Sequence, residues 1–190
     1  MGQIILVTGG GRSGKSSYAQ KMAESLQAPR AFLATCPPID EEMTARIRTH
    51  QDARRHKNWH TIEESLDIAE AIQNAHEFPT ILVDCLTLWI NNLLYQAEQS
   101  NRSLSESDIA QECARLIAAC KSHSGTIICV TNEIGMGLIP ENALSRLYRD
   151  LVGRCNQIIA ESSLRVVLLV SGQPIEIKHP PAGINIGGVQ

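Results

Sequence analysis

The chain has 190 residues and a mass of 20.8 kDa, which suits one domain with a substantial buried core. A formal net charge of −3 at pH 7 and a pI near 6.1 argue against a nucleic-acid-binding domain, which would carry a basic patch. No apolar run approaches the ~20 residues of a membrane span, and we expect the amino terminus to enter a strand instead of forming a secretory leader. We therefore expect a single cytoplasmic domain, residues 1–190, with no nucleic-acid or membrane partner.

The first predicted element is a buried strand at residues 4–7, and the segment after it matches G-x-x-x-x-G-K-[ST]. In such a P-loop, glycines turn successive backbone N–H groups toward one anionic centre at the start of a helix. Lys15 would reach the β- and γ-phosphates, and the Ser16 hydroxyl would ligate Mg²⁺. The predicted phosphate-binding residues are Gly9, Gly10, Gly11, Arg12, Ser13, Gly14, Lys15 and Ser16.

Alternating strand and helix patterns follow along the chain and predict an α/β fold with a parallel sheet and right-handed crossovers. Further buried strands are expected at residues 31–34, 80–83, 126–130 and 166–170, with a short edge strand at 175–178. Helices are expected at 18–26, 41–50, 66–75 and 86–98, then from a cap at Ser107 and Asp108 to about 121, and at 140–162.

The strand at 80–83 runs directly into Asp84. In a P-loop fold we expect the strand beside the first one to end in an aspartate that holds Mg²⁺ opposite the loop hydroxyl. Asp84 fits that role, although aspartates at strand ends also occur as ordinary turn residues.

Residues 40–63 contain three histidines and four arginines, which is dense for an acidic chain. One interpretation is a solvated helix face followed by a basic loop. The other is a second phosphate-handling element, in which arginines pair with phosphate and a histidine attacks phosphorus. A zinc site is less favoured, because the histidines lack the spacing of a zinc-binding helix.

A strand also ends at Thr131, Asn132 and Glu133, and two glycines follow it. Doubly wound folds bind ligands at the carboxyl edge of the sheet, so this segment is a candidate for substrate contact. A plain flexible connection is the alternative.

The six cysteines form no C-x-x-C pair, and several lie inside apolar patterns. We expect buried thiols rather than disulfides or zinc ligands. They are Cys36, Cys85, Cys113, Cys120, Cys129 and Cys155.

Taken together, several stretches resemble the bifunctional adenosylcobinamide kinase / adenosylcobinamide-phosphate guanylyltransferase family of cobalamin biosynthesis. The resemblance runs from residue 4 to about residue 178. Beside the generic P-loop, the stretches that carry it are Glu42-Met43 with Arg46-Ile47 and His50, Trp59-x-Thr61-x-Glu63, Val83-Asp84-Cys85-Leu86-Thr87, Thr131-Asn132-Glu133-Ile134-Gly135-Met136-Gly137 with Pro140-Glu141-Asn142, and Val170-Ser171-Gly172.

The resemblance implies a P-loop NTPase fold with a mostly parallel, recombinase-like sheet flanked by helices, an antiparallel edge strand near the C-terminus, and a homotrimer. It implies ATP or GTP, with Mg²⁺, as phosphoryl donor to adenosylcobinamide. GMP then passes from GTP to adenosylcobinamide phosphate through a guanylylated histidine, His50. Nucleotide contacts are implied for Gly9 through Ser16 and for Ala34, Thr35, Cys36, Gln51, Asp52, Ala53, Arg54, Glu63 and Asp84.

Two other functions compete with this one. The first is a small P-loop kinase of another metabolite or nucleoside, with the histidine and arginine segment as a lid. The second is a nucleotide-dependent switch module. The late strand end reads Thr131-Asn132-Glu133-Ile134 where a GTPase switch would carry Asn-Lys-x-Asp, which counts against the second.

Overall fold

The computed structural model describes residues 1–36, 52, 54 and 57–181. Its core is one seven-stranded sheet with the order β3-β2-β4-β5-β1-β6-β7. Every pairing is parallel except that of β6 with β7, which is antiparallel, as expected for the last strand. The strands are β1 (Gln3–Gly9), β2 (Arg30–Ala34), β3 (Trp59–Glu63), β4 (Thr80–Asp84), β5 (Thr126–Val130), β6 (Arg165–Val170) and β7 (Gln173–Lys178).

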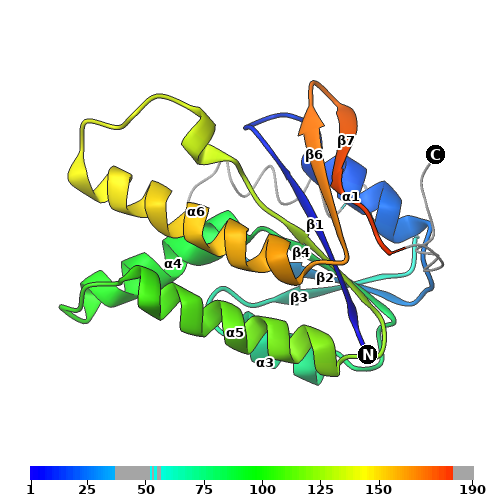
Figure 1. The fold of residues 1–190 in the computed structure, drawn as a ribbon. Helices are drawn as coiled ribbons and strands as arrows, with labels where there is room; N and C mark the ends of the chain where they lie inside the picture. Colours follow the sequence, from blue (N-terminus) through cyan, green and yellow to red (C-terminus); the bar gives the residue numbers. More distant parts are fainter. Residues whose placement is uncertain (37–51, 53, 55–56, 182–190) are drawn as a thin grey trace.

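Helices cover both faces of the sheet unequally (Figure 1). Among the helices whose bounds the structure describes, α1 lies on one face, and α3, α4, α5 and α6 lie on the opposite face. The helices are α1 (Lys15–Glu24), α3 (Ile68–Asn74), α4 (Leu86–Gln99), α5 (Glu106–Ser122) and α6 (Ala143–Ser162), with a 3-10 turn η1 at Ile134–Met136. None of these helices is both long enough and apolar enough to cross a bilayer.

Strand β1 shows why the sheet needs helices on both sides. Ile4 and Leu6 point into the core beneath α3–α6, whereas Ile5 and Val7 point into the core beneath α1. Successive side chains of a strand alternate between faces, so a continuous apolar run requires cover on both. The expected mostly parallel α/β sheet is confirmed.

Four helix starts differ from those expected: α1 begins at Lys15 and not at 18, α3 begins at Ile68 and not at 66, and α5 and α6 have other caps. Helix α6 begins after Asn142, whose side chain accepts from the N–H groups of Leu144 and Ser145, and not at Pro140. Helix α5 is capped by Ser105 in a capping box with Asp108, and not by Ser107. In both cases the helix starts where an acceptor side chain reaches the unpaired N–H groups of the first turn.

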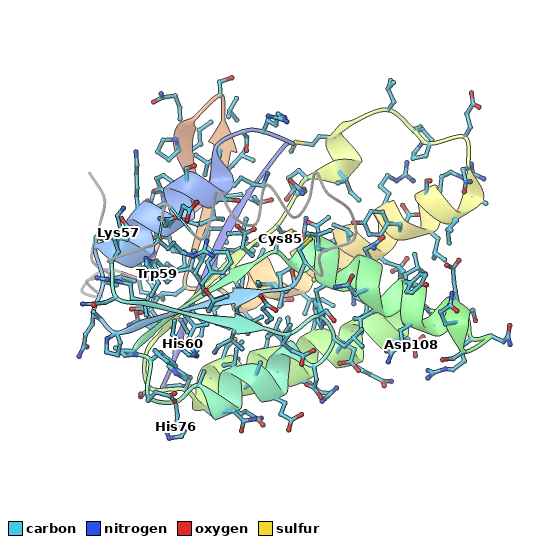
Figure 2. The ribbon with its side chains drawn as sticks, turned by 180° about the vertical axis from the view of Figure 1, so that it is seen from behind. Lys57, Trp59, His60, His76, Cys85 and Asp108 are labelled. Atoms are coloured by element: carbon cyan, nitrogen blue, oxygen red, sulfur yellow. The ribbon has the colours of Figure 1, made fainter. Side chains whose placement is uncertain are left out.

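Strand β3 is the element that the sequence patterns did not predict. Its five residues follow the basic segment and pair in parallel with β2, from Arg30 beside Trp59 to Ala34 beside Glu63. Trp59 packs into the core on the α1 side, and His60 lies on the opposite side of the strand (Figure 2). His60 stacks on Phe78 with 5.3 Å between ring centroids. Aromatic and β-branched residues in this segment were the available signal for a strand. The charged neighbours and the short length of the segment obscured that signal.

Candidate functional site

The P-loop links β1 to α1, and two of its glycines have backbone conformations that favour glycine. Gly9 has φ 148°, and Gly14, the N-cap of α1, has φ 94°. A Cβ on Gly9 would lie 2.5 Å from the carbonyl oxygen of Leu169, so this position excludes a side chain. The loop therefore packs closely against β6, and α1 begins at its end with N–H groups suited to an anion.

The turn between β6 and β7 supports the loop from the other side. The N–H of Gly172 donates to the carbonyl of Ser13 at 2.9 Å. A Cβ on Gly14 would lie 3.4 Å from the Cα of Gly172. The turn contains Ser171 and Gly172, both with positive φ. The Ser171-Gly172 turn therefore contacts the phosphate-binding loop and supports it.

The carboxyl ends of five strands form one edge beside this loop. Register places Val7 beside Val130, Val130 beside Asp84, and Asp84 beside Ala34. Ala34 in turn lies beside Glu63. The expectation that the aspartate strand lies next to the first strand is wrong, because β5 lies between β1 and β4. Asp84 therefore faces the loop across β5, and the end of β5 adjoins the loop directly.

Lys15 is buried at the first turn of α1, with 8% of its surface exposed. Its ammonium donates to the carbonyl of Gly10 at 2.7 Å. Burial lowers the pKa of Lys15, and its neighbours Cys85, Asp84 and Glu133 oppose that shift. Burial also raises the pKa of the Cys85 thiol to about 12. Two carboxylates, Asp84 and Glu133, therefore supply the negative charge near this lysine at neutral pH.

Thr35 holds the end of β4 in place. Its hydroxyl donates to the carbonyl of Cys85 at 2.8 Å and accepts from the Cys85 N–H at 2.8 Å. The Asp84–Cys85 peptide bond, which precedes these groups, is cis. From α4, Asn92 donates to the carbonyl of Thr35 at 2.8 Å. Figure 2 shows Cys85 near the middle of the molecule. The two hydrogen bonds with Thr35 fix the backbone just after Asp84.

The end of β5 carries a buried polar network that joins α4, β5 and α6. Thr131 donates to Oδ1 of Asn156 at 2.7 Å, and the N–H of Asn132 donates to the hydroxyl of Thr87 at 2.8 Å. Asn156 donates to the Asn132 carbonyl at 3.0 Å and to Glu133 at 3.2 Å. This network fixes the Glu133 side chain next to the P-loop.

Arg54 is buried on the α1 face, with 5% of its surface exposed. Its guanidinium carbon lies 3.5 Å from the centroid of the Phe32 ring, and Phe32 meets Trp59 edge-on at 6.3 Å. Its Nε and Nη1 have no hydrogen-bond partner in the described part of the chain. Burial lowers the pKa of Arg54, and Asp84 opposes the shift. A buried guanidinium with unused donors suits an anionic ligand.

The structure brings most of the predicted site residues together. The P-loop, Ala34 to Cys36, Asp84 and Arg54 meet around the ends of β1, β2 and β4. Glu63 is exposed at the end of β3, four strand spacings from β1, or roughly 19 Å. It therefore lies too far away to contact the same phosphate as Lys15. Asp52 is exposed, and His50, Gln51 and Ala53 lie outside the described residues.

Three residues of the site were not identified from the sequence: Thr87, Tyr148 and Asn156. Tyr148 donates to the Thr87 carbonyl at 2.9 Å, and Asn156 is 7% exposed. Asn156 lies next to Cys155 on the buried face of α6. A polar residue on an otherwise apolar helix face is the signal that could have found it.

The oxygen donors near the loop fit magnesium. Ser16 offers a hydroxyl in the first turn of α1, and Asp84 offers a carboxylate at the sheet edge. Such hard oxygen ligands suit Mg²⁺, whose remaining ligands in P-loop enzymes are water and phosphate. In the part of the chain that the structure describes, no group of three or more histidine, cysteine, aspartate or glutamate side chains forms a metal site.

Comparison with known proteins gives a consistent result. Residues 5–177 match the family model described as cobinamide kinase / cobinamide phosphate guanyltransferase, CobU. The bifunctional adenosylcobalamin biosynthesis protein CobU of Salmonella typhimurium is 40% identical over 184 residues, covering 92% of this chain and 99% of the relative. The bifunctional adenosylcobalamin biosynthesis protein CobP of Pseudomonas aeruginosa is 39% identical over 177 residues, covering 93% and 98%.

Solved structures with the same fold are distant in sequence. A KaiC-like protein of Pyrococcus horikoshii aligns with a TM-score of 0.51 at 15% identity, covering 87% of this chain and 70% of that one. An ATPase of a bacterial type III secretion system aligns with a TM-score of 0.55 at 14% identity, covering 88% and 51%. These structures support the P-loop ATPase type of fold and nothing finer.

Proposed function

This chain belongs to the cobinamide kinase / cobinamide phosphate guanyltransferase family, and on that premise we propose that one P-loop site takes part in both of its reactions. In the first, adenosylcobinamide receives the γ-phosphoryl group of ATP or GTP. In the second, the product receives GMP from GTP, giving adenosylcobinamide-GDP and pyrophosphate. The observation that carries this proposal is the buried Lys15 at the P-loop, with Asp84 and Glu133 close to it.

In both reactions the loop has the same task, which is to hold the β- and γ-phosphates. The N–H groups of the loop and the N-terminus of α1 donate to phosphate oxygens, and Lys15 balances their charge. In the kinase reaction the γ-phosphoryl is the group transferred. In the guanylyl reaction the same two phosphates leave as pyrophosphate.

Magnesium fits this arrangement. Ser16 and Asp84 would hold the ion, Asp84 through its water shell. When bound, Mg²⁺ neutralises part of the charge that develops on the phosphate oxygens. Lys15 and the loop N–H groups orient the same oxygens from the protein side.

For the second reaction we propose His50 as the residue that carries GMP. Its ring nitrogen attacks the α-phosphorus of GTP, the bond to the β-phosphate breaks and pyrophosphate leaves. A phosphate oxygen of adenosylcobinamide phosphate then attacks the same phosphorus, and the histidine departs. The support is the match to the family's Arg-Ile-x-x-His pattern at Arg46, Ile47 and His50.

Among the residues that the structure describes, Arg54 supports a second binding position for an anion, near Asp84. Its guanidinium lies over the Phe32 ring, and two of its nitrogens have no hydrogen-bond partner in the described part of the chain. We propose that Arg54 pairs with nucleotide phosphate, and that Thr35, Cys36 and Glu63 extend the nucleotide site along the sheet edge. Asp52 and the neighbouring Gln51 and Ala53 belong to the same proposed set of contacts.

The test uses GTP labelled at either the α- or the γ-phosphate, followed by quenching and a search for acid-labile, base-stable label on the protein. We expect label from the α position alone, and none in His50→Ala. Lys15→Ala should abolish phosphorylation of adenosylcobinamide. A wild-type protein that never holds α-label would leave a plain kinase, and Lys15→Ala with full kinase activity would contradict the role of the loop.

We also infer a homotrimer that acts in the cytoplasm. Support for the trimer comes from the family resemblance, and light scattering should give about three times 20.8 kDa. Support for a reducing compartment comes from the cysteines, none of which is in a disulfide although there are six.

A further inference from the structure

The backbone of Glu133 is hydrogen-bonded to the end of β1, the strand that leads into the P-loop. Because β5 pairs directly with β1, the ladder continues past the end of β5 as the Thr131 N–H donates to the carbonyl of Val7 at 3.0 Å. Two residues later the Glu133 N–H donates to the carbonyl of Gly9, also at 3.0 Å. The backbone of Glu133 is therefore fixed to the first glycine of the loop.

The Glu133 side chain is fixed as well. Its Oε1 accepts from the hydroxyl of Thr8, the residue just before the loop, and from Nδ2 of Asn156. Among the described residues, no hydrogen bond engages the second oxygen, Oε2. One carboxylate oxygen thus anchors the side chain, and the other is available to a substrate at the loop.

A directed series of hydrogen bonds sets the orientation of Asn156. The Asn132 N–H donates to Thr87, so the Thr87 hydroxyl keeps its own proton for Thr131, 3.2 Å away. The Thr131 hydroxyl donates to Oδ1 of Asn156, which turns the Nδ2 amide toward Glu133. The two Nδ2 protons of Asn156 go to the Asn132 carbonyl and to Glu133, so Asn156 is a positioning residue that holds Glu133.

We propose that Glu133 is the proton acceptor of the kinase reaction; this proposal rests on the proposed function. The Glu133 carboxylate takes the proton of the aminopropanol hydroxyl of adenosylcobinamide as that oxygen bonds to the γ-phosphorus. The bond from the γ-phosphorus to the β-phosphate oxygen breaks, and the nucleoside diphosphate leaves. Glu133 then returns the proton to solvent.

The two reactions differ in whether the acceptor must lose a proton. This difference distinguishes a proton acceptor from a residue that only supports the structure. A hydroxyl must lose a proton when it is phosphorylated. The acceptor of the guanylyl reaction is a phosphate monoester, which is already ionised at neutral pH and needs no base. A residue that acts as proton acceptor for the hydroxyl is therefore needed in the first reaction alone, although both reactions use the same loop.

The experiment measures both half-reactions in Glu133→Gln. Phosphorylation of adenosylcobinamide should lose at least about 100-fold in kcat. The KM for the nucleotide, and the rate of guanylyl transfer to preformed adenosylcobinamide phosphate, should stay within about threefold. Glu141→Gln is the matched control, since this exposed glutamate follows in the same connection and should change neither reaction.

Two further results decide between a base and a structural residue. Glu133→Asp keeps the charge but shortens the side chain, so it should lose the kinase reaction selectively and more mildly. The inference is overturned if both reactions fall together in either variant, or if Glu133→Gln keeps the kinase reaction. A wild-type protein that phosphorylates no adenosylcobinamide would instead contradict the proposed function itself.

Discussion

The Thr35 hydroxyl bonds both polar groups of the Cys85 backbone, donating to its carbonyl and accepting from its N–H at 2.8 Å each. The two residues are 50 positions apart in the chain and lie at the ends of neighbouring strands. Thr35 is fully buried. Water therefore cannot replace these bonds, and the position of Asp84 depends on them.

Thr35→Val should destabilise the protein by about 1–3 kcal/mol for each Cys85 backbone group left unpaired, and weaken GTP binding. Valine has nearly the same shape, so the effect isolates the hydroxyl. Urea unfolding and a GTP titration measure the two quantities. Thr61→Val in β3 is the control, because the half-buried Thr61 hydroxyl has no hydrogen bond to any described residue. If the two variants lose the same stability and the same GTP affinity, the Thr35 hydroxyl does not fix the end of β4.

Arg54→Met should weaken GTP binding while leaving the nucleotide-free protein as stable or more stable. Burial already lowers the pKa of Arg54, which shows that its charge is poorly solvated, and two of its nitrogens have no partner in the described part of the chain. Methionine keeps the packing on Phe32 without the charge.

Thermal unfolding with and without GTP measures both effects for Arg54→Met. Loss of a charge-assisted contact should reduce the GTP-dependent rise in Tm, equivalent to about 1.5–3 kcal/mol. Arg102→Met, at an exposed arginine in the connection before α5, is the control. If Arg54→Met destabilises the free protein and leaves GTP binding unchanged, Arg54 has a structural role only.

Gly9→Ala should abolish nucleotide binding and destabilise the fold. The backbone φ of 148° disfavours a side chain, and the added Cβ would lie 2.5 Å from the backbone of Leu169. A residue in such a conformation costs about 1–3 kcal/mol before the steric clash is added. Urea unfolding and GTP titration report the result. Gly135→Ala, where a Cβ meets nothing within 4 Å, should be almost silent.

Stability should fall as pH rises from 9 toward 12. Burial raises the pKa values of Cys85 and Cys120 from 9.0 to about 12. In this interval the unfolded chain has lost thiol protons that the folded chain keeps, so it binds fewer protons and unfolding becomes easier. The slope is about 1.4 kcal/mol per pH unit for each such thiol.

Urea unfolding from about pH 8 to about pH 10.5 measures this loss. Cys120→Ala removes one titrating thiol and should flatten the slope. An unchanged slope in Cys120→Ala would show that other groups cause the loss.

The sequence by itself determined the local parts of this protein. The short apolar run at 126–130, rich in Ile and Val, predicted a buried strand, and the motif from Gly9 to Ser16 predicted a phosphate-binding loop. The same patterns identified Asp84 and the thiols, five of which are buried. Each of these depends on residues adjacent in the chain.

Only the tertiary structure decided which strand ends meet at the loop. Strand order depends on how each crossover packs on the sheet. The sequence of a buried apolar strand does not indicate which place in the sheet that strand takes. Because β5 lies between β1 and β4, Asp84 is separated from β1 by one strand, and Glu133 at the end of β5 lies next to Gly9. Asn156 joined the site from α6, 23 residues after Glu133, because a helix packed across the sheet brings a distant amide to the strand end.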